Sequence, residues 1–232
     1  AGVHVNFAPD ADVNSNPANP VIGYRAFGED PARVAKASTA YSLGLEDGGV
    51  QAVAKHFPGH GDTDSDSHKT LPIVKHTRTR LDSTDLVPFA DFIDAGCSGV
   101  MVGHIAVPAL DASGCPASLS ALVTDKLLRR EMGFEGLIYT DALGMKGSSE
   151  YTAHPALAAL KAGADVLLCP TNAKAEINAI EAAQRRNIAC RYRRTLQTRA
   201  SLQILLQGLG TRAERLAALC KDKQPRGRGT DQ

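Results

Sequence analysis

Short runs of apolar residues alternate along this chain with longer segments whose apolar positions recur at helical spacing. The apolar runs predict buried β-strands over residues 3–8, 50–56, 98–104, 136–140 and 165–169. The helical spacing predicts helices over residues 31–47, 82–95, 118–131, 154–162 and 173–185, with Asp82 or Ser83 capping the second and Ser118 or Ser120 capping the third. Strands and helices that alternate in this way indicate a parallel sheet built from βα units.

Polar residues gather after several of the predicted strands rather than after one. They are Arg25, residues 56–68, His104 and Asp141. Neither the glycine pattern of a dinucleotide site nor a phosphate-binding loop follows any strand. Because sites assembled from several strand ends are typical of (β/α) barrels, we expect an α/β fold with a (β/α)8 TIM-type barrel rather than a doubly wound sheet.

The composition is that of a globular chain without a strong charge bias. Of the 232 residues, 43% are hydrophobic and 22% are charged, which provides enough apolar material for a sizeable core. The formal net charge of +1 argues against a dedicated nucleic-acid-binding protein. No apolar run approaches the roughly 20 residues of a membrane-spanning helix, so we expect no membrane span.

The densest group of chemically active residues is the loop from Lys55 to His68. It holds three His, three Asp, one Lys and two Gly, and it follows the predicted strand over residues 50–56. In α/β proteins the carboxyl ends of strands are where ligands bind and reactions occur. The two glycines, Gly59 and Gly61, also predict a loop that moves between open and closed forms.

The pair Asp66 and His68 in this loop has the spacing of a general acid/base and its orienting carboxylate. An Asp two residues from a His can orient the imidazole ring and raise its basicity. A solvated loop is the plainer alternative, and the loop's His and Asp residues could also ligate zinc or calcium. A calcium loop beginning at Asp62 would need Gly at its sixth position and Glu at its twelfth, where Ile73 stands, so we expect no metal.

Three further positions carry candidate chemistry outside that pair. Asp141 directly follows a predicted strand, where a carboxylate can be a nucleophile, a base or the cap of the next helix. Lys55 and His56 end a strand and would point hydrogen-bond donors suited to sugar hydroxyls into the mouth of a barrel. Arg25 could clamp a substrate or pair with the nearby Glu29 or Asp30.

Four segments of the chain, in this order, resemble the β-N-acetylglucosaminidases (β-N-acetylhexosaminidases) of glycoside hydrolase family 3. They are Asn6-Phe7-Ala8-Pro9 with Asp12; the run from Arg25 to Asp30; the run from Lys55 to His68 with Leu71-Pro72; and Thr140-Asp141 through Gly147. The third segment is the most specific, and it separates this branch from the family's β-glucosidases, which take their acid/base from another domain. The resemblance covers about residues 3–170.

The resemblance implies a retaining mechanism and assigns roles by position. Asp141 would be the nucleophile, and His68 would be the general acid/base, oriented by Asp66. Arg25, Lys55 and His56 would hold the terminal sugar. Retaining hydrolysis needs one nucleophile and one proton donor flanking the scissile bond, so no cofactor is implied.

The resemblance also implies that part of the barrel is missing from this chain. Family members carry an upstream motif of the Asp-Gln-Glu-Gly-Gly-Arg type, which supplies sugar-binding groups, and nothing here matches it. We therefore expect an N-terminally truncated chain that lacks the first two βα units. Residues 1–190 would form a partial catalytic barrel, and residues 191–232 a basic C-terminal helix with a disordered tail.

The expected activity is removal of terminal β-linked N-acetylglucosamine from glycans such as peptidoglycan fragments. The alternatives are a family 3 β-glucosidase, a glycoside phosphorylase, or an inactive glycan-binding fragment, because part of the sugar site is absent. A carbohydrate is the expected partner. The sequence leaves open the activity of the shortened chain, the oligomeric state and the compartment, cytoplasmic or periplasmic.

Overall fold

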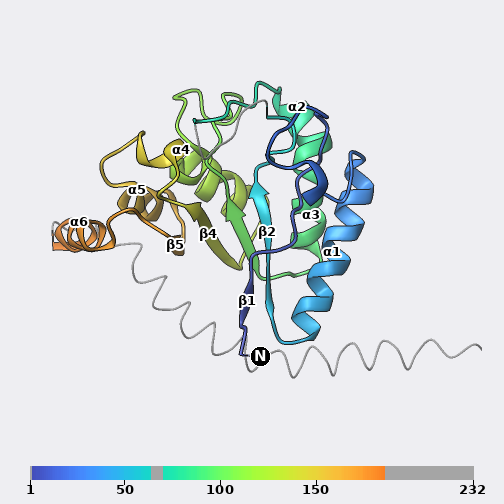
Figure 1. Cartoon of the computed structure of the whole chain (residues 1–232), viewed down its shortest axis with the longest axis horizontal. Coiled ribbons are helices and arrows are strands. Elements are labelled where there is room, and N and C mark those ends of the chain that lie inside the picture. Colours follow the sequence, from blue (N-terminus) through green and yellow to red (C-terminus); the bar gives the residue numbers. More distant parts are fainter. Residues whose placement is uncertain (1, 64–69, 186–232) are drawn as a thin grey trace, which may run out of the picture. The chain divides into compact units, whose positions relative to one another are not determined.

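The computed structural model describes residues 2–63 and 70–185, which belong to one compact unit, Ala1–Arg191. The basic helix and tail expected over residues 191–232 lie outside the described residues. The centre of the unit is a parallel sheet of five strands (Figure 1). The strands are β1 Val5–Asn6, β2 Gln51–Phe57, β3 Gly99–Val102, β4 Leu137–Ala142 and β5 Val166–Leu168. All five predicted strands are therefore present, with their ends shifted by only a few residues.

The strand order decides between the two parallel folds that the sequence pattern allows. The strands lie side by side in chain order, β1-β2-β3-β4-β5, and every neighbouring pair is parallel. A doubly wound sheet reverses its strand order at a switch point, whereas a (β/α) barrel adds each strand next to the previous one. The order confirms the expected α/β class and a sheet of the barrel type.

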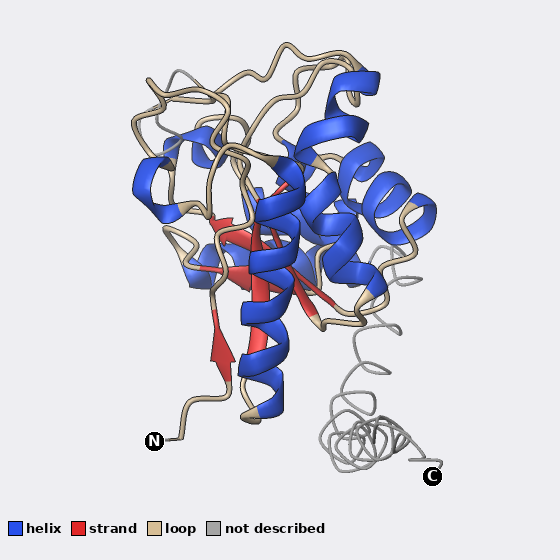
Figure 2. Cartoon of the chain, turned by 90° about the vertical axis from the view of Figure 1, so that its right-hand side faces the viewer, coloured by secondary structure: helices blue, strands red, loops and turns tan. Residues whose placement is uncertain are grey.

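Both faces of the sheet are apolar, which explains why its strands are near-continuous hydrophobic runs. One face packs against the helices, and Figure 2 shows the longest of them, α1 (Pro31–Asp47), lying in front of the strands. On the other face Phe7 and Tyr139 make an edge-to-face ring contact, with centroids 5.7 Å apart. The strand residues of the helix-covered face include Ala52, Ala54, Val100, Val102 and Ile138; those of the opposite face are Val53, Met101, Leu137 and Tyr139.

The helices connect the strands and cover one face of the sheet. The predicted bounds of α1 and the predicted start of the last described helix, α6, are confirmed to the residue. No helix in residues 2–63 and 70–185 is long and apolar enough to span a bilayer. After α1 the helical segments are α2 Arg78–Arg80, η2 Leu81–Asp85, α3 Val87–Asp94, η3 Ala117–Leu119, η4 Leu122–Glu131, α4 Lys146–Ser149, α5 Pro155–Ala162 and α6 Ala173–Arg185, and a short turn, η1 Gly23–Arg25, precedes α1.

Helix capping corrects one prediction and confirms another. The second helical segment begins at Arg78, not at Asp82 or Ser83, because the side chain of Thr77 accepts a hydrogen bond from Arg80 N at 3.3 Å. The helix therefore starts one turn earlier than its apolar spacing indicated. In the third segment Ser120 is a cap as predicted, since its Oγ accepts from the backbone N of Val123 at 3.4 Å.

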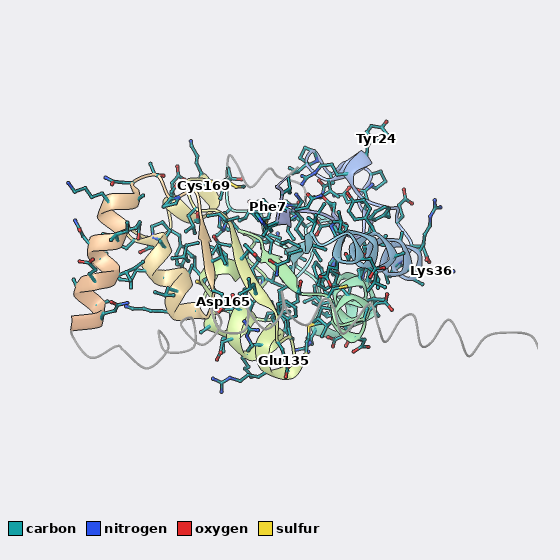
Figure 3. All side chains as sticks on the ribbon, turned by 90° about the horizontal axis from the view of Figure 1, so that it is seen from below. Phe7, Tyr24, Lys36, Glu135, Asp165 and Cys169 are labelled. Carbon is teal, nitrogen blue, oxygen red and sulfur yellow. The ribbon has the colours of Figure 1, made fainter. Side chains whose placement is uncertain are left out.

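Arg129 in η4 joins the amino ends of β4 and β5. Its Nη1 donates to the carbonyl oxygens of Phe134 at 2.6 Å and Gly136 at 2.7 Å, and its Nη2 donates to Asp165 Oδ2 at 2.7 Å. The same carboxylate oxygen accepts from Ile138 N at 2.9 Å. Figure 3 views the chain from this end of the sheet and labels Asp165. The guanidinium therefore ties a helix, a turn and two strands together.

We expect Arg129→Met to lower the free energy of unfolding by about 3–5 kcal/mol, because it leaves the Asp165 carboxylate buried without its counter-ion. The Arg129 and Asp165 side chains are only 16% and 10% exposed. Lys126→Met is the matched control, because Lys126 and its partner Glu131 are 64% and 39% exposed; its expected cost is below about 1 kcal/mol. Urea unfolding followed by circular dichroism measures both, and equal losses would contradict the prediction.

Candidate active site

Polar side chains from four strands meet at the carboxyl edge of the sheet, the end toward which the arrows of Figure 1 point. The backbone at Asp10 continues the β1–β2 pairing by bridging to Lys55. Because parallel strands end at the same edge, residues far apart in the chain lie close together there. These residues are Asp10 and Asp12 after β1, Lys55 and His56 in β2, His104 after β3, and Asp141 in β4.

Asp12 organises this edge from a fully buried position. Its Oδ1 accepts from His60 N at 2.6 Å, and its Oδ2 lies 2.7 Å from His56 Nδ1. Both carboxylate oxygens lie 3.2 Å from His56 N. One carboxylate therefore fixes the end of β2 and the loop that follows it. Burial raises the pKa of Asp12, while His60 opposes the shift. The ionised carboxylate can only accept, so beside it His56 Nδ1 carries the proton and Nε2 is left as an acceptor.

Burial favours the neutral form of two imidazoles at this edge, those of His56 and His60. Burial lowers the pKa of His56 to about 4, against the opposing influence of Asp10 and Asp141. Burial also lowers the pKa of His60, and Asp12 opposes that shift. The His60 ring lies edge-on to the His56 ring, with centroids 5.7 Å apart, and its Nδ1 lies 2.7 Å from Thr63 Oγ1. Neutral imidazoles suit hydrogen bonding to uncharged hydroxyl groups.

Arg25 reaches the same edge from the turn η1. Its Nη2 lies 3.2 Å from Asp10 Oδ2, and its side chain is 42% exposed, so it lies at the solvent boundary of the site. The ion-pair partner in the structure is thus Asp10, not Glu29 or Asp30. Burial and the neighbouring Asp12 raise the pKa of Asp10 to about 7. Arg25 opposes that shift and holds Asp10 partly ionised at neutral pH.

Lys55 and Asp141 supply opposite charges within this group. Lys55 is half-buried, and burial followed by repulsion from Arg25 lowers its pKa, while Asp10 and Asp141 counteract the shift. Asp141 Oδ1 accepts from the backbone N of Ala142 at 2.7 Å. The influence of Asp141 on Lys55, His56 and His60 places its carboxylate within electrostatic reach of all three.

The structure brings together four of the six site residues that the sequence predicted. Arg25, Lys55, His56 and Asp141 share the carboxyl edge of the sheet. Asp66 and His68 lie outside the described residues, so their assignment stays a prediction.

The two chain segments that flank residues 64–69 are held to each other. Asp62 Oδ2 lies 2.5 Å from His76 Nε2, which joins the segment before these residues to the segment after them. Asn19 Nδ2 donates to the carbonyl oxygen of His60 at 2.8 Å, which anchors the first segment to the chain after β1. The pairing of Ile73 with Ala106 anchors the second.

Gly59 and Gly61 have a packing reason in the structure. A Cβ on Gly61 would lie 1.8 Å from the carbonyl oxygen of Val13, which no side chain allows. Gly59 has a φ of +129°, and a Cβ there would lie 2.7 Å from Asp85 Cβ. Both glycines therefore permit close backbone approach, which explains them without the loop movement that their presence suggested.

Asp85 is a buried carboxylate behind this loop. It is 1% exposed, and its Oδ2 has no hydrogen-bond partner in the described residues. Burial raises the pKa of Asp85 from 3.8 to about 6, and His76 and Arg80 oppose the shift. Below pH 3.8, the ordinary pKa that applies in the unfolded chain, Asp85 is protonated in both states. Between pH 3.8 and about 6, the raised pKa of the folded chain, only the folded state binds the proton. Stability is therefore lost as the pH rises from about 4 through about 6.

We expect Asp85→Asn to raise the free energy of unfolding at pH 8 by up to about 3 kcal/mol and to flatten its fall between about pH 4 and 6. The neutral amide avoids the cost of burying a charge. Asp82→Asn, at an exposed carboxylate on the same helical segment, is the control and should leave the pH profile unchanged. Denaturant titrations from pH 4 to 8 measure the profile, and an Asp85→Asn variant that is less stable at every pH would contradict the prediction.

One cluster in the described residues has the composition of a metal site. Asp10, Asp12 and His56 offer ligand atoms within 4.8 Å of one another. Carboxylate and imidazole groups are zinc ligands in other proteins. Here Arg25 already pairs with Asp10, and N–H groups of His56 and His60 occupy Asp12. These contacts favour a site for polar, uncharged groups over a metal centre.

The sequence analysis did not assign roles to three residues that the structure places in the site. Asp10 and Asp12 follow a strand just as Asp141 does, so the strand-end rule applied to Asp141 would have found them. His60 lies in the loop that was singled out, but its burial against Asp12 depends on contacts between segments 48 residues apart.

Comparisons with known proteins agree with this architecture. A model of the glycosyl hydrolase family 3 N-terminal domain matches residues 1–190. β-Hexosaminidase A of Pseudoalteromonas piscicida is 44% identical over 182 residues, which are 73% of this chain and 30% of that protein. A β-hexosaminidase of Nitrosospira multiformis is 40% identical over 181 residues, 76% of this chain and 51% of the relative. The chain thus spans about a third to a half of these curated relatives.

Solved structures lead to the same family. The structure of a glycoside hydrolase family 3 β-N-acetylglucosaminidase from Paenibacillus sp. str. FPU-7 superposes with a TM-score of 0.82 at 38% identity, covering 99% of this chain and 43% of that one. The resemblance inferred from the four sequence segments is confirmed by the domain match, the curated relatives and this structure. The chain belongs to glycosyl hydrolase family 3.

Proposed function

We propose that this chain carries the catalytic site of a retaining glycoside hydrolase that removes terminal β-linked N-acetylglucosamine. The observation that carries the proposal is the placement of Asp141 at the same sheet edge as Lys55, His56 and Arg25. Relatives named β-hexosaminidase and β-N-acetylglucosaminidase support the choice of sugar. Peptidoglycan fragments that end in this sugar are the proposed natural substrates.

In the proposed mechanism Asp141 attacks the anomeric carbon while His68 protonates the departing glycosidic oxygen. The bond to the leaving group breaks, and a covalent bond forms between Asp141 and the sugar. His68 then takes a proton from a water molecule, the water oxygen attacks the anomeric carbon, and the Asp141 carboxylate is released. Asp66 orients the His68 ring through both steps.

The remaining residues bind the sugar and keep the Asp141 carboxylate ionised. The Lys55 ammonium group favours the ionised form of Asp141, which a nucleophile requires. Neutral His56, held by Asp12, presents Nε2 as an acceptor for a hydroxyl group. Arg25, braced by Asp10 at the solvent boundary, offers guanidinium donors to the same sugar.

A panel of aryl glycosides tests the reaction class on the 232-residue chain. Release of the aryl group from the β-N-acetylglucosaminide, with retention at the anomeric carbon in the sugar product, is the expected result. Preference for the β-glucoside would favour a β-glucosidase. One structural neighbour at 28% identity is the β-glucoside phosphorylase BglX, so each assay is run with and without phosphate. Release that requires phosphate would identify a phosphorylase, and binding without release would indicate a glycan-binding fragment.

We expect His68→Ala to slow substrates with poor leaving groups far more than substrates with activated ones. Acid catalysis contributes about 10²- to 10⁴-fold, and an activated aryl leaving group departs without a proton. The comparison uses the methylumbelliferyl N-acetylglucosaminide, which has the poorer leaving group, and the dinitrophenyl N-acetylglucosaminide, which has the activated one. His154→Ala, at an exposed imidazole, is the control. Equal losses on both substrates would show that His68 only positions the sugar.

A further inference from the structure

We propose that His104 is a positioning residue for Asp141, acting through the backbone of Ala142. The inference rests on the proposed role of Asp141 as the nucleophile. His104 lies just after β3 and is fully buried. Its Nε2 lies 3.0 Å from the carbonyl oxygen of Ala142, the residue that follows Asp141.

The register of the sheet shows what this contact replaces. Strands β3 and β4 pair in parallel from Gly99 opposite Leu137 to Val102 opposite Thr140, and the pairing stops there. Two residues further along, the same register brings His104 opposite Ala142. The imidazole therefore supplies, from a side chain, the link that the backbone ladder no longer makes.

Ala142 is held on both of its backbone groups. Its carbonyl oxygen accepts from His104, and its N–H donates to Asp141 Oδ1 at 2.7 Å. His104 therefore restrains the Asp141 carboxylate indirectly, through the backbone of Ala142. Without the imidazole, the Ala142 carbonyl would keep Met145 N as a donor at 3.0 Å, and Ala142 would stay paired with Leu168 of β5. The contact to the β3 side would be lost, at the point where the nucleophile must be aligned with the sugar.

Ser118 sets the tautomer that this arrangement needs. The Ala142 carbonyl only accepts, so Nε2 of His104 must carry a proton. Ser118 Oγ lies 2.7 Å from His104 Nδ1 and can donate to it. The backbone N of Ser118 also donates to the carbonyl oxygen of Gly103 at 3.2 Å, which braces the chain just before His104. For a neutral ring at this fully buried position, the Nε2–H tautomer is therefore the one that the two contacts favour.

The first test needs no variant that might fail to fold. Nitrogen-15 spectra of the unmodified chain near neutral pH should show His104 as one tautomer, with a protonated Nε2 and an unprotonated Nδ1. Assignment uses the signals that are lost in His104→Gln and that shift in Ser118→Ala, whereas the tautomer itself is read from the unmodified chain. A protonated Nδ1 with an unprotonated Nε2, or fast exchange between tautomers, would overturn the proposal.

The second test separates positioning from a purely structural role. His104→Gln keeps an N–H donor near the Nε2 position, whereas His104→Leu has none, and His154→Gln is the exposed control. The readouts are the NMR chemical shifts of the Ala142 amide proton and the Asp141 carboxyl carbon, followed through a pH titration. His104→Leu should move the Asp141 midpoint by roughly half a pH unit or more, while His104→Gln stays close to the parent chain. Equal shifts in both variants, or none in His104→Leu, would overturn the proposal.

Turnover adds a readout that depends on the proposed function. Where aryl N-acetylglucosaminide is hydrolysed, His104→Leu should lower kcat about 10-fold or more with little change in KM, because alignment of the nucleophile is lost. His104→Gln should restore most of the rate. An inactive parent chain that still shows the tautomer and the Asp141 shift would reject the proposed hydrolysis and leave the positioning role standing.

Discussion

Replacement of Asp141 by Asn should abolish hydrolysis of aryl N-acetylglucosaminides while leaving the fold intact. Removal of an enzymatic nucleophile lowers turnover by about 10⁴-fold or more. The amide cannot form the ester bond to the sugar, but it matches the carboxylate in size and can still accept from Ala142 N. Initial rates with methylumbelliferyl N-acetylglucosaminide measure the loss, and unchanged urea unfolding confirms the fold.

A fluorinated N-acetylglucosaminide that traps the covalent intermediate provides the independent check. Peptide mass spectrometry of the parent chain should place the label on Asp141, and Asp141→Asn should remain unlabelled. Asp62→Asn is the matched control, because Asp62 lies in the loop of the site and pairs with His76. This variant should still be labelled on Asp141. A label on Asp62, Asp64 or Asp66 would contradict the assignment of the nucleophile.

Replacement of Asp12 by Ala should cause the largest loss of stability of any single carboxylate in the site. The free energy of unfolding should fall by about 3–5 kcal/mol, because buried N–H groups of His56 and His60 lose their acceptor. Asp12 is fully buried, and its contacts span 44 and 48 residues of sequence. Activity should fall as well, since the end of β2 and the loop after it lose their shared anchor.

Two comparison variants sharpen this prediction. Asp12→Asn keeps one oxygen acceptor and should lose less stability than Asp12→Ala. Asp91→Ala, at an exposed position on α3, should change the free energy of unfolding by no more than about 0.5 kcal/mol. Urea titrations at pH 7 measure all three. A loss in Asp12→Ala no larger than that in Asp91→Ala would show that Asp12 is not the anchor of the site.

The positions of strands and helices were predictable because they depend on local patterns. Apolar runs and helical spacing located all five strands, and they gave both bounds of α1 and the start of α6 to the residue. The start of the second helix was missed, because Thr77 caps it one turn before its apolar spacing begins. Capping depends on a single side chain and its backbone geometry, which a periodic pattern does not record.

The candidate site was predictable only in part. Strand-end position and motif resemblance identified Arg25, Lys55, His56 and Asp141, which the structure brings to one edge of the sheet. The alternative considered for Arg25, an ion pair with Glu29 or Asp30, named the wrong carboxylates, because these residues are near in sequence whereas Asp10 is near in space. Proximity along the chain is a poor guide where a turn returns a side chain to an earlier strand.

By itself, the sequence determined the elements of this protein, its fold class and the residues capable of glycoside chemistry, since composition, periodicity and motifs are properties of the chain. The tertiary structure alone decided which of those residues act together. Asp12 reaches His56 and His60 only when β1 and β2 lie side by side, and His104 meets Ala142 only through the β3–β4 register. Burial, which arises only on folding, then sets the pKa values of His56 and Asp10.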